Sequence, residues 1–245
     1  MNRKQINIAV FGSSVALTIR PKRLTREEGN YCDIIKSKLK DQGNEVYLMN
    51  YASRSRIISH ENVLDYVGNL QKANPDYVIL HYGINEAAPR LWPYRIWMLL
   101  HKPKWYRGRM FMYFNSKLVK IESLLMKIFK SKGWVTEKKF EKLYRALIET
   151  AVSETKSKII TISICEPNDH YIKVLPNIEK QISEYNAIIE KVSMELSAVF
   201  INLQNISSQI PKRHVAPDGA HLSGLGHQIV GEEILNIILR INDEI

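Results

Sequence analysis

The run Ile6-Asn7-Ile8-Ala9-Val10-Phe11, continued by Gly12-Ser13-Ser14, is the stretch of this 245-residue sequence that decides the fold. It is rich in β-branched and aromatic residues and has the length of a buried strand. The glycine and two serines that follow it are typical of a turn. This stretch therefore predicts a buried strand that ends in a polar turn.

Four further runs of the same kind are spread along the chain. They are Glu45–Met49, Tyr77–His81, Lys158–Ile164 and Val199–Leu203. Amphipathic segments of helical length separate them, which predicts an α/β fold with a five-stranded parallel sheet flanked by helices. Thr25 with Glu28 predicts a capping box for the first of these helices, which ends near Gly43, and Ser223 predicts the cap of the last.

The bulk composition is that of a globular protein, with 45% hydrophobic residues, and the length suits one sizeable α/β domain over residues 1–245. The two cysteines, Cys32 and Cys165, form neither a disulfide framework nor a CxxC zinc pair. No apolar run approaches the ~20 residues that cross a bilayer. From these features we expect a cytoplasmic protein with reduced thiols, without a metal or organic cofactor.

The positive charge is concentrated in one part of the chain. Residues 90–145 hold 15 Lys and Arg but 3 Glu, a charge of +12 within a total of +10, so the remainder carries −2. Such asymmetry indicates an anionic substrate, partner or membrane surface. Nucleic acid is the least favoured partner, because no recognised nucleic-acid motif accompanies the charge.

Much of this charge falls in an insert, residues 87–133, that interrupts the alternation of strands and helices. It starts with a Trp-, Tyr- and Pro-rich stretch and continues into a candidate amphipathic helix, Asn115–Lys130, with Leu118, Ile121, Leu125 and Ile128 on one stripe. We expect a basic, aromatic lid beside the site. It could lie peripherally on an anionic membrane, shape a substrate pocket, form a dimer surface or simply pack its stripe on the domain.

Three polar positions follow or precede predicted elements where reactive groups collect. Ser14 lies just past the first strand, Asn85 just past the third, and Asp218-Gly219-Ala220-His221 lies before the last helix. The carboxyl ends of parallel strands meet at one edge of a sheet. A hydroxyl, an imidazole, a carboxylate and an amide donor at one edge are what nucleophilic acyl transfer needs.

These motifs, Gly12-Ser13-Ser14, Gly83-Ile84-Asn85-Glu86 and Asp218-Gly219-Ala220-His221, resemble the sequence blocks of the SGNH/GDSL hydrolase superfamily of esterases and acyltransferases. The resemblance implies a flavodoxin-like three-layer sandwich. It also implies that Ser14 is the nucleophile, His221 the base and Asp218 its partner. Asn85 would donate to the oxyanion through its side chain, together with backbone N–H groups of Ser14 and of Arg54 or Ser55.

The sequence departs from the family pattern at three places. Ser13 stands where the family has Asp, and Glu86 replaces the second Asp of its block. The loop Asn50–Ser55 contains no glycine, although the family's second block does. A backbone N–H can still serve as the donor there, because the oxyanion hole needs no side chain at that position.

Other serine and histidine positions compete with these roles. Ser13 is the rival of Ser14 as nucleophile, and Asp169-His170 is the rival acid–base pair, which we interpret as part of a loop. We expect His81 to be a hydrogen-bonded core residue and His227 a surface or packing residue. A metal site at Asp218 and His221 is not favoured, because no HExxH motif or Cys/His cluster accompanies them.

The sequence therefore predicts a serine-dependent ester hydrolase, or deacylase, that acts on a small, lipid-linked or carbohydrate ester through an acyl-enzyme. Two alternatives stay open. One is an O-acyltransferase that uses the same Ser-His-Asp site. The other is a non-catalytic binding protein with the same fold.

Overall fold

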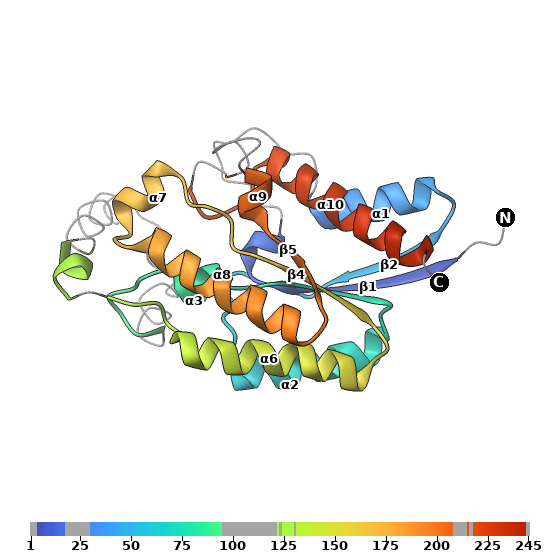
Figure 1. Ribbon diagram of the computed structural model, residues 1–245, viewed down its shortest axis with the longest axis horizontal. Helices are drawn as coiled ribbons and strands as arrows, with labels where there is room; N and C mark the ends of the chain where they lie inside the picture. Colours follow the sequence, from blue (N-terminus) through green and yellow to red (C-terminus); the bar gives the residue numbers. More distant parts are fainter. Residues whose placement is uncertain are drawn as a thin grey trace, which may run out of the picture.

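The computed structural model contains the predicted parallel sheet, in the strand order β2-β1-β3-β4-β5 (Figure 1). The structure describes residues 4–17, 30–94, 122, 124–129, 131–207, 215 and 218–243, without the side chains of 60–62 and 64. The strands are β1 Gln5–Gly12, β2 Glu45–Asn50, β3 Tyr77–His81, β4 Lys158–Ile162 and β5 Val199–Ile201. This order is that of flavodoxin-like folds, so the predicted fold class is confirmed.

Helices cover both faces of the sheet, which makes three layers (Figure 1). On one face lie α1 (Tyr31–Asp41) and α10 (Gly224–Asp243), and on the other lie α2 (His60–Ala73), α6 (Glu137–Glu154) and α8 (Ile178–Glu195). Shorter helices lie in the connections, and they are η1 (Ser14–Ala16), α3 (Ile84–Ala87), α7 (Asp169–Val174) and α9 (Leu203–Ser207). None of the helices described here is long and apolar enough to span a bilayer.

Strand β1 lies inside the sheet, between β2 and β3, and contributes side chains to both halves of the core. Ile8 and Val10 belong to the cluster under α1 and α10, whereas Ala9 and Phe11 belong to the cluster under α2, α6 and α8. Because all four side chains are completely buried, each large one contributes on the order of 1.5–3 kcal/mol to stability. The two-sided burial explains why the run is apolar throughout instead of alternating.

The carboxyl ends of β1 and β3 are held unusually close. Gly12 pairs with His81, and a Cβ atom on Gly12 would lie 2.4 Å from the His81 carbonyl oxygen. The Ser13 backbone N–H donates to the same oxygen at 3.2 Å. Glycine is therefore required at position 12 by the backbone of the neighbouring strand.

Strands β4 and β5 end two residues earlier than predicted, and two helix starts were also predicted wrongly. Helix α1 begins later than predicted, because the Asn30 side chain caps it by accepting from Cys32 N at 2.8 Å, and Asp33 completes the capping box. The predicted cap residues 25 and 28 lie outside the described residues. The pair Asp169-His170, interpreted as a loop, starts helix α7, since the Asn168 side chain accepts from Tyr171 N at 3.0 Å.

The insert 87–133 is described only at its two ends, so residues 95–121 and the predicted lid and membrane contact lie outside the described residues. The described part of the candidate helix, 122 and 124–128, is helical. The two described residues of the stripe, Leu125 and Ile128, are not buried. Ile128 is 63% exposed and Met126 is the buried residue, at 4%.

The two cysteines are buried and unpaired.

We expect Gly12→Ala to lower the free energy of unfolding by at least about 1–3 kcal/mol, because the new methyl group meets backbone instead of a movable side chain. Urea unfolding checks this. Gly68→Ala in α2 is the matched control: no described atom lies within 4 Å of its new Cβ, so it should stabilise the protein by roughly 0.5–1 kcal/mol. Equal effects of the two substitutions would contradict the close approach.

Candidate active site

Three side chains from distant parts of the chain form one hydrogen-bonded series at the carboxyl edge of the sheet. Ser14, the first residue after the turn that ends β1, places its Oγ 2.8 Å from His221 Nε2. On the other side of the ring, His221 Nδ1 lies 2.7 Å from Asp218 Oδ2. A carboxylate can only accept, so Nδ1 carries the proton and Nε2 is left to accept from the Ser14 hydroxyl.

The Asp218 carboxylate is held by its own loop. Its Oδ1 accepts from the backbone N–H groups of Ala220, at 3.0 Å, and of His221, at 3.1 Å. Partial burial favours the neutral acid, but these hydrogen bonds and the contact with His221 outweigh it and lower the pKa of Asp218 to about 2. The carboxyl group of Asp218 is therefore ionised at neutral pH.

The conformation of this loop depends on Gly219. Its φ is +82°, and a Cβ there would lie 2.5 Å from Asn168 Oδ1 and from Tyr171 Cβ. The loop thus packs tightly against the start of α7. The Asp-Gly-Ala-His sequence works as a unit, because the glycine permits the turn and the aspartate bonds close it.

The rival serine is excluded from this series by its position. The Ser13 side chain is completely buried, and its hydroxyl has no hydrogen-bond partner among the described residues. The structure therefore brings Ser14, and not Ser13, to the imidazole.

The predicted oxyanion donors line the same cleft, which has a volume of about 280 Å³. Asn85, in α3, donates from Nδ2 to the Arg56 carbonyl oxygen at 2.9 Å. Ser55 has φ +56°, the left-handed conformation that favours glycine. The loop without a glycine thus keeps a glycine-like backbone. The lining residues are Ser14, Ser55, Ile84, Asn85, Arg90, Trp134, Tyr171, Asp218, Ala220 and His221.

A buried carboxylate ties together the two loops that carry these donors. Glu86 is completely buried, and its two oxygens accept from Ile58 N at 2.6 Å and from Gly83 N at 3.0 Å. Burial raises the pKa of Glu86 to about 7, although the backbone hydrogen bonds oppose the rise. Gly133, at the end of the insert, packs so closely that a Cβ there would lie 1.7 Å from the Glu86 carbonyl oxygen.

Two buried histidines lie behind the site and match their predicted packing roles. The Tyr31 hydroxyl lies 3.4 Å from His81 Nδ1, and the Tyr31 backbone N–H donates to His227 Nδ1 at 3.4 Å. Burial lowers the pKa of His81 to about 3 and that of His227 to about 4. Both rings are therefore neutral packing groups at physiological pH.

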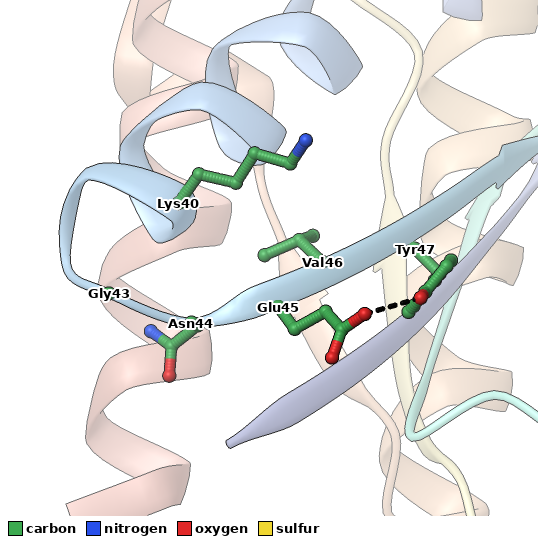
Figure 2. Close-up of a pocket in the computed structure, with 6 residues that line it drawn as sticks. All are labelled: Lys40, Gly43, Asn44, Glu45, Val46 and Tyr47. Carbon is green, nitrogen blue, oxygen red and sulfur yellow. Dashed lines mark hydrogen bonds between the residues drawn. The ribbon is translucent and has the colours of Figure 1, made fainter. Parts of the chain in front are cut away.

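A second hollow lies at the opposite end of the sheet (Figure 2). It is formed by the turn between α1 and β2 and the start of β2, where Glu45 pairs with Gln5 at the beginning of β1. Ser14 follows the other end of β1, so this hollow is remote from the predicted site. The Tyr47 hydroxyl donates to Glu45 across it. Among the described residues, no group of three or more His, Cys, Asp and Glu could hold a metal ion.

Sequence reasoning missed three lining residues, Arg90, Trp134 and Tyr171. Arg90 lies in the first part of the insert and Trp134 directly follows its end, and the Arg90 guanidinium lies 5.0 Å from the centre of the Trp134 ring. The basic and aromatic composition of the insert was the available signal, but it did not single out these positions.

We expect Ser55→Gly to raise the free energy of unfolding by up to about 1 kcal/mol, because relief of the left-handed strain exceeds the added entropy of the unfolded chain. Ser55→Val should instead destabilise by at least about 1 kcal/mol, since a β-branched residue tolerates this φ least. Denaturant unfolding of the two variants checks both signs. A loss of stability in Ser55→Gly would contradict the strain.

The pKa of Glu86 predicts a pH dependence of stability. The folded state holds this proton up to about pH 7, whereas the unfolded chain releases it near 4.5, so folding binds a proton between these values. The free energy of unfolding should therefore fall by about 3 kcal/mol as the pH rises through this window. Urea titrations of wild type and Glu86→Gln at several pH values measure the free energy of unfolding, and this pH-dependent fall should be missing in the variant. Parallel pH profiles would contradict the raised pKa.

The fold is shared with several solved esterases and lipases. Across 96% of this chain and 95% of the other, it resembles a lipase/acylhydrolase from Enterococcus faecalis, with 17% identity and a TM-score of 0.60. A psychrotrophic esterase from Pseudoalteromonas sp. matches over 96% and 98%, with 13% identity and a TM-score of 0.56. An acetyl xylan esterase from Geobacillus stearothermophilus matches over 96% of both chains, with 15% identity and a TM-score of 0.57.

Sequence comparison gives the family directly. Among curated protein sequences, none shows a significant match to the chain. The model of the GDSL-like Lipase/Acylhydrolase family, in contrast, matches residues 10–229, which include all three motifs described above. The chain therefore belongs to the GDSL-like lipase/acylhydrolase family.

Proposed function

We propose that the protein is a serine-dependent ester hydrolase in which Ser14 is the nucleophile, His221 the general base and Asp218 the group that orients the imidazole. The observation that carries the proposal is the pair of contacts on the His221 ring, 2.8 Å to Ser14 Oγ and 2.7 Å to Asp218 Oδ2. Membership of a lipase/acylhydrolase family supports the same reaction class.

The first half of the reaction forms an acyl-enzyme. Ser14 Oγ attacks the ester carbonyl carbon while its proton passes to His221 Nε2, and the carbonyl oxygen becomes an oxyanion. As the tetrahedral intermediate collapses, the bond to the alcohol oxygen breaks and the alcohol leaves with the proton from His221. In the second half, water attacks the acyl carbon and gives a proton to His221. The bond between the acyl carbon and Ser14 Oγ then breaks, Oγ takes the proton back from His221, and the carboxylic acid leaves. No metal or organic cofactor enters these steps.

Asn85 and two backbone N–H groups are the proposed donors to the oxyanion. One N–H of the Asn85 amide is committed to the Arg56 carbonyl oxygen, which fixes the plane of the amide and leaves the second N–H for the oxyanion. The backbone N–H groups of Ser14 and Ser55 would complete the hole. Each such donor is worth about 10²–10³ in turnover.

The size of the cleft and the state of the thiols support a proposal for the class of substrate and for the compartment in which the protein acts. A cleft of about 280 Å³ suits a small ester, or the ester end of a lipid-linked or carbohydrate substrate. The buried, unpaired cysteines support a cytoplasmic setting. An O-acyltransferase would use the same first half and an alcohol in place of water in the second.

We expect Ser14→Ala to abolish labelling by a fluorophosphonate probe and to lower hydrolysis of p-nitrophenyl acetate by about 10⁴-fold or more, since the attacking oxygen is removed. Ser13→Ala is the matched control. It deletes a neighbouring buried hydroxyl that has no partner among the described residues, so labelling and hydrolysis should persist.

Labelling that survives in Ser14→Ala would overturn the assignment of the nucleophile. Absence of both labelling and hydrolysis in the wild type would favour the non-catalytic binding protein. Product ratios in the presence of an added alcohol separate hydrolysis from acyl transfer.

A further inference from the structure

Arg90 lies in the wall of the cleft that holds Ser14 and His221. Its guanidinium packs over the Trp134 ring, with Cζ 5.0 Å from the ring centre, which is a cation–π contact. Two hydrogen bonds hold this wall together, from Arg90 N to the Lys132 carbonyl oxygen at 3.0 Å and from Trp134 Nε1 to the Trp92 carbonyl oxygen at 2.9 Å. Arg90 therefore belongs to a segment that these hydrogen bonds hold in place.

The charge of Arg90 is not neutralised within the described part of the chain. No described carboxylate lies within ion-pair distance of it, whereas Arg56 has Asp65 at 3.6 Å and Arg145 pairs with Glu195. Asp218 is the one acid among the cleft-lining residues, and its two oxygens are occupied by His221 and the loop backbone. Arg90 thus faces the cleft as an uncompensated cation.

One nitrogen of Arg90 is also left without a hydrogen bond. The Nε atom is buried and has no partner among the described residues. Burying an unsatisfied donor of a charged group is costly, so such a group is expected where a ligand supplies the missing acceptor. The Tyr171 hydroxyl lies beside the guanidinium, whose charge opposes the rise in Tyr171 pKa that packing causes. A second potential donor thus adjoins the cation.

The stretch of sequence that follows Arg90 contains no acidic residue that could pair with its guanidinium in place of a ligand. Residues 91–121 contain seven Lys and Arg and neither Asp nor Glu. This adjoining stretch therefore adds positive charge and cannot provide a carboxylate partner.

We propose that Arg90, seated on Trp134 and adjoining Tyr171, forms an anion subsite that selects esters whose acyl or alcohol part carries a carboxylate or phosphate. The planar guanidinium can bind either group through two parallel N–H···O bonds. This inference names a substrate class for the Ser14 site and so rests on the proposed function. Arg90 acts in specificity and takes no part in the proton transfers.

The kinetic test compares matched pairs of anionic and neutral esters. On the acyl side, the mono-p-nitrophenyl ester of glutaric acid is paired with p-nitrophenyl valerate. On the alcohol side, 4-carboxyphenyl acetate and 4-acetoxyphenyl phosphate are each paired with 4-carbamoylphenyl acetate. We expect wild type to prefer the anionic member of at least one pair. The pair that shows this preference identifies whether the acyl or the alcohol part is recognised, and whether the recognised group is a carboxylate or a phosphate.

Arg90→Gln should lower the ratio of kcat/KM for that anionic ester to kcat/KM for its neutral partner by about 10- to 100-fold, as for a lost charged hydrogen bond. Arg90→Lys should recover part of the ratio, because it keeps the charge without the planar fork. Arg145→Gln, the same substitution at an exposed ion pair on α6, should leave the ratio unchanged. Using a ratio removes any general loss of folded protein from the comparison.

A binding measurement separates this inference from the proposed function. Calorimetry with the uncleaved anionic ester is done on Ser14→Ala and on Ser14→Ala/Arg90→Gln, and the second protein should bind about 10-fold or more weakly. If wild type shows no Ser14-dependent hydrolysis but binding still depends on Arg90, the hydrolase proposal fails and the subsite stands. If hydrolysis depends on Ser14 but neither the ratio nor the binding depends on Arg90, the subsite is overturned alone.

Discussion

The arrangement of the site depends on the contact between two backbones at the ends of β1 and β3. Gly12 pairs with His81, and no side chain fits between them, since even a Cβ would lie 2.4 Å from a carbonyl oxygen. Two strand ends that are fixed to each other must send their loops out of the sheet side by side. The loops that carry Ser14 and Asn85 are therefore neighbours because β1 and β3 pair, and Gly12 allows that pairing to continue to the strand ends.

The buried carboxylate of Glu86 holds these neighbouring loops in a defined position. It accepts from Ile58 N and Gly83 N, so it joins the loop of Ser55 to the start of the helix of Asn85. Hydrogen bonds to a charged group contribute about 1.5–3 kcal/mol each, yet burying a carboxylate costs several kcal/mol. The effect of burial exceeds that of the hydrogen bonds, since the pKa of Glu86 rises to about 7. The hydrogen bonds of Glu86 thus join the two loops, while its burial lowers the stability of the fold as the carboxyl group ionises.

Much of the fold was predictable because each strand is a local property of the sequence. β1 is buried on both faces, so its run is apolar throughout, and β3 starts and ends where the pattern predicted. The meeting of Ser14 with His221 was also predictable, since parallel strands place their carboxyl ends at one edge. Helix starts were less predictable. Thr25 and Asn30 are both good caps in isolation, and the packing of Tyr31 in the core decides between such candidates.

The features that sequence reasoning missed depend on contacts between distant segments. Ser55 adopts a backbone conformation that favours glycine, and nothing in its residue type signals it. Arg90 is one of 15 basic residues in 90–145, and composition alone ranks none of them above another. The pairing of Arg90 N with Lys132 O and the bond from Trp134 to Trp92 bring the two ends of the insert together. That backbone pairing decides which cation faces the Ser14 cleft, so the charge of the insert becomes specific only once the chain has folded.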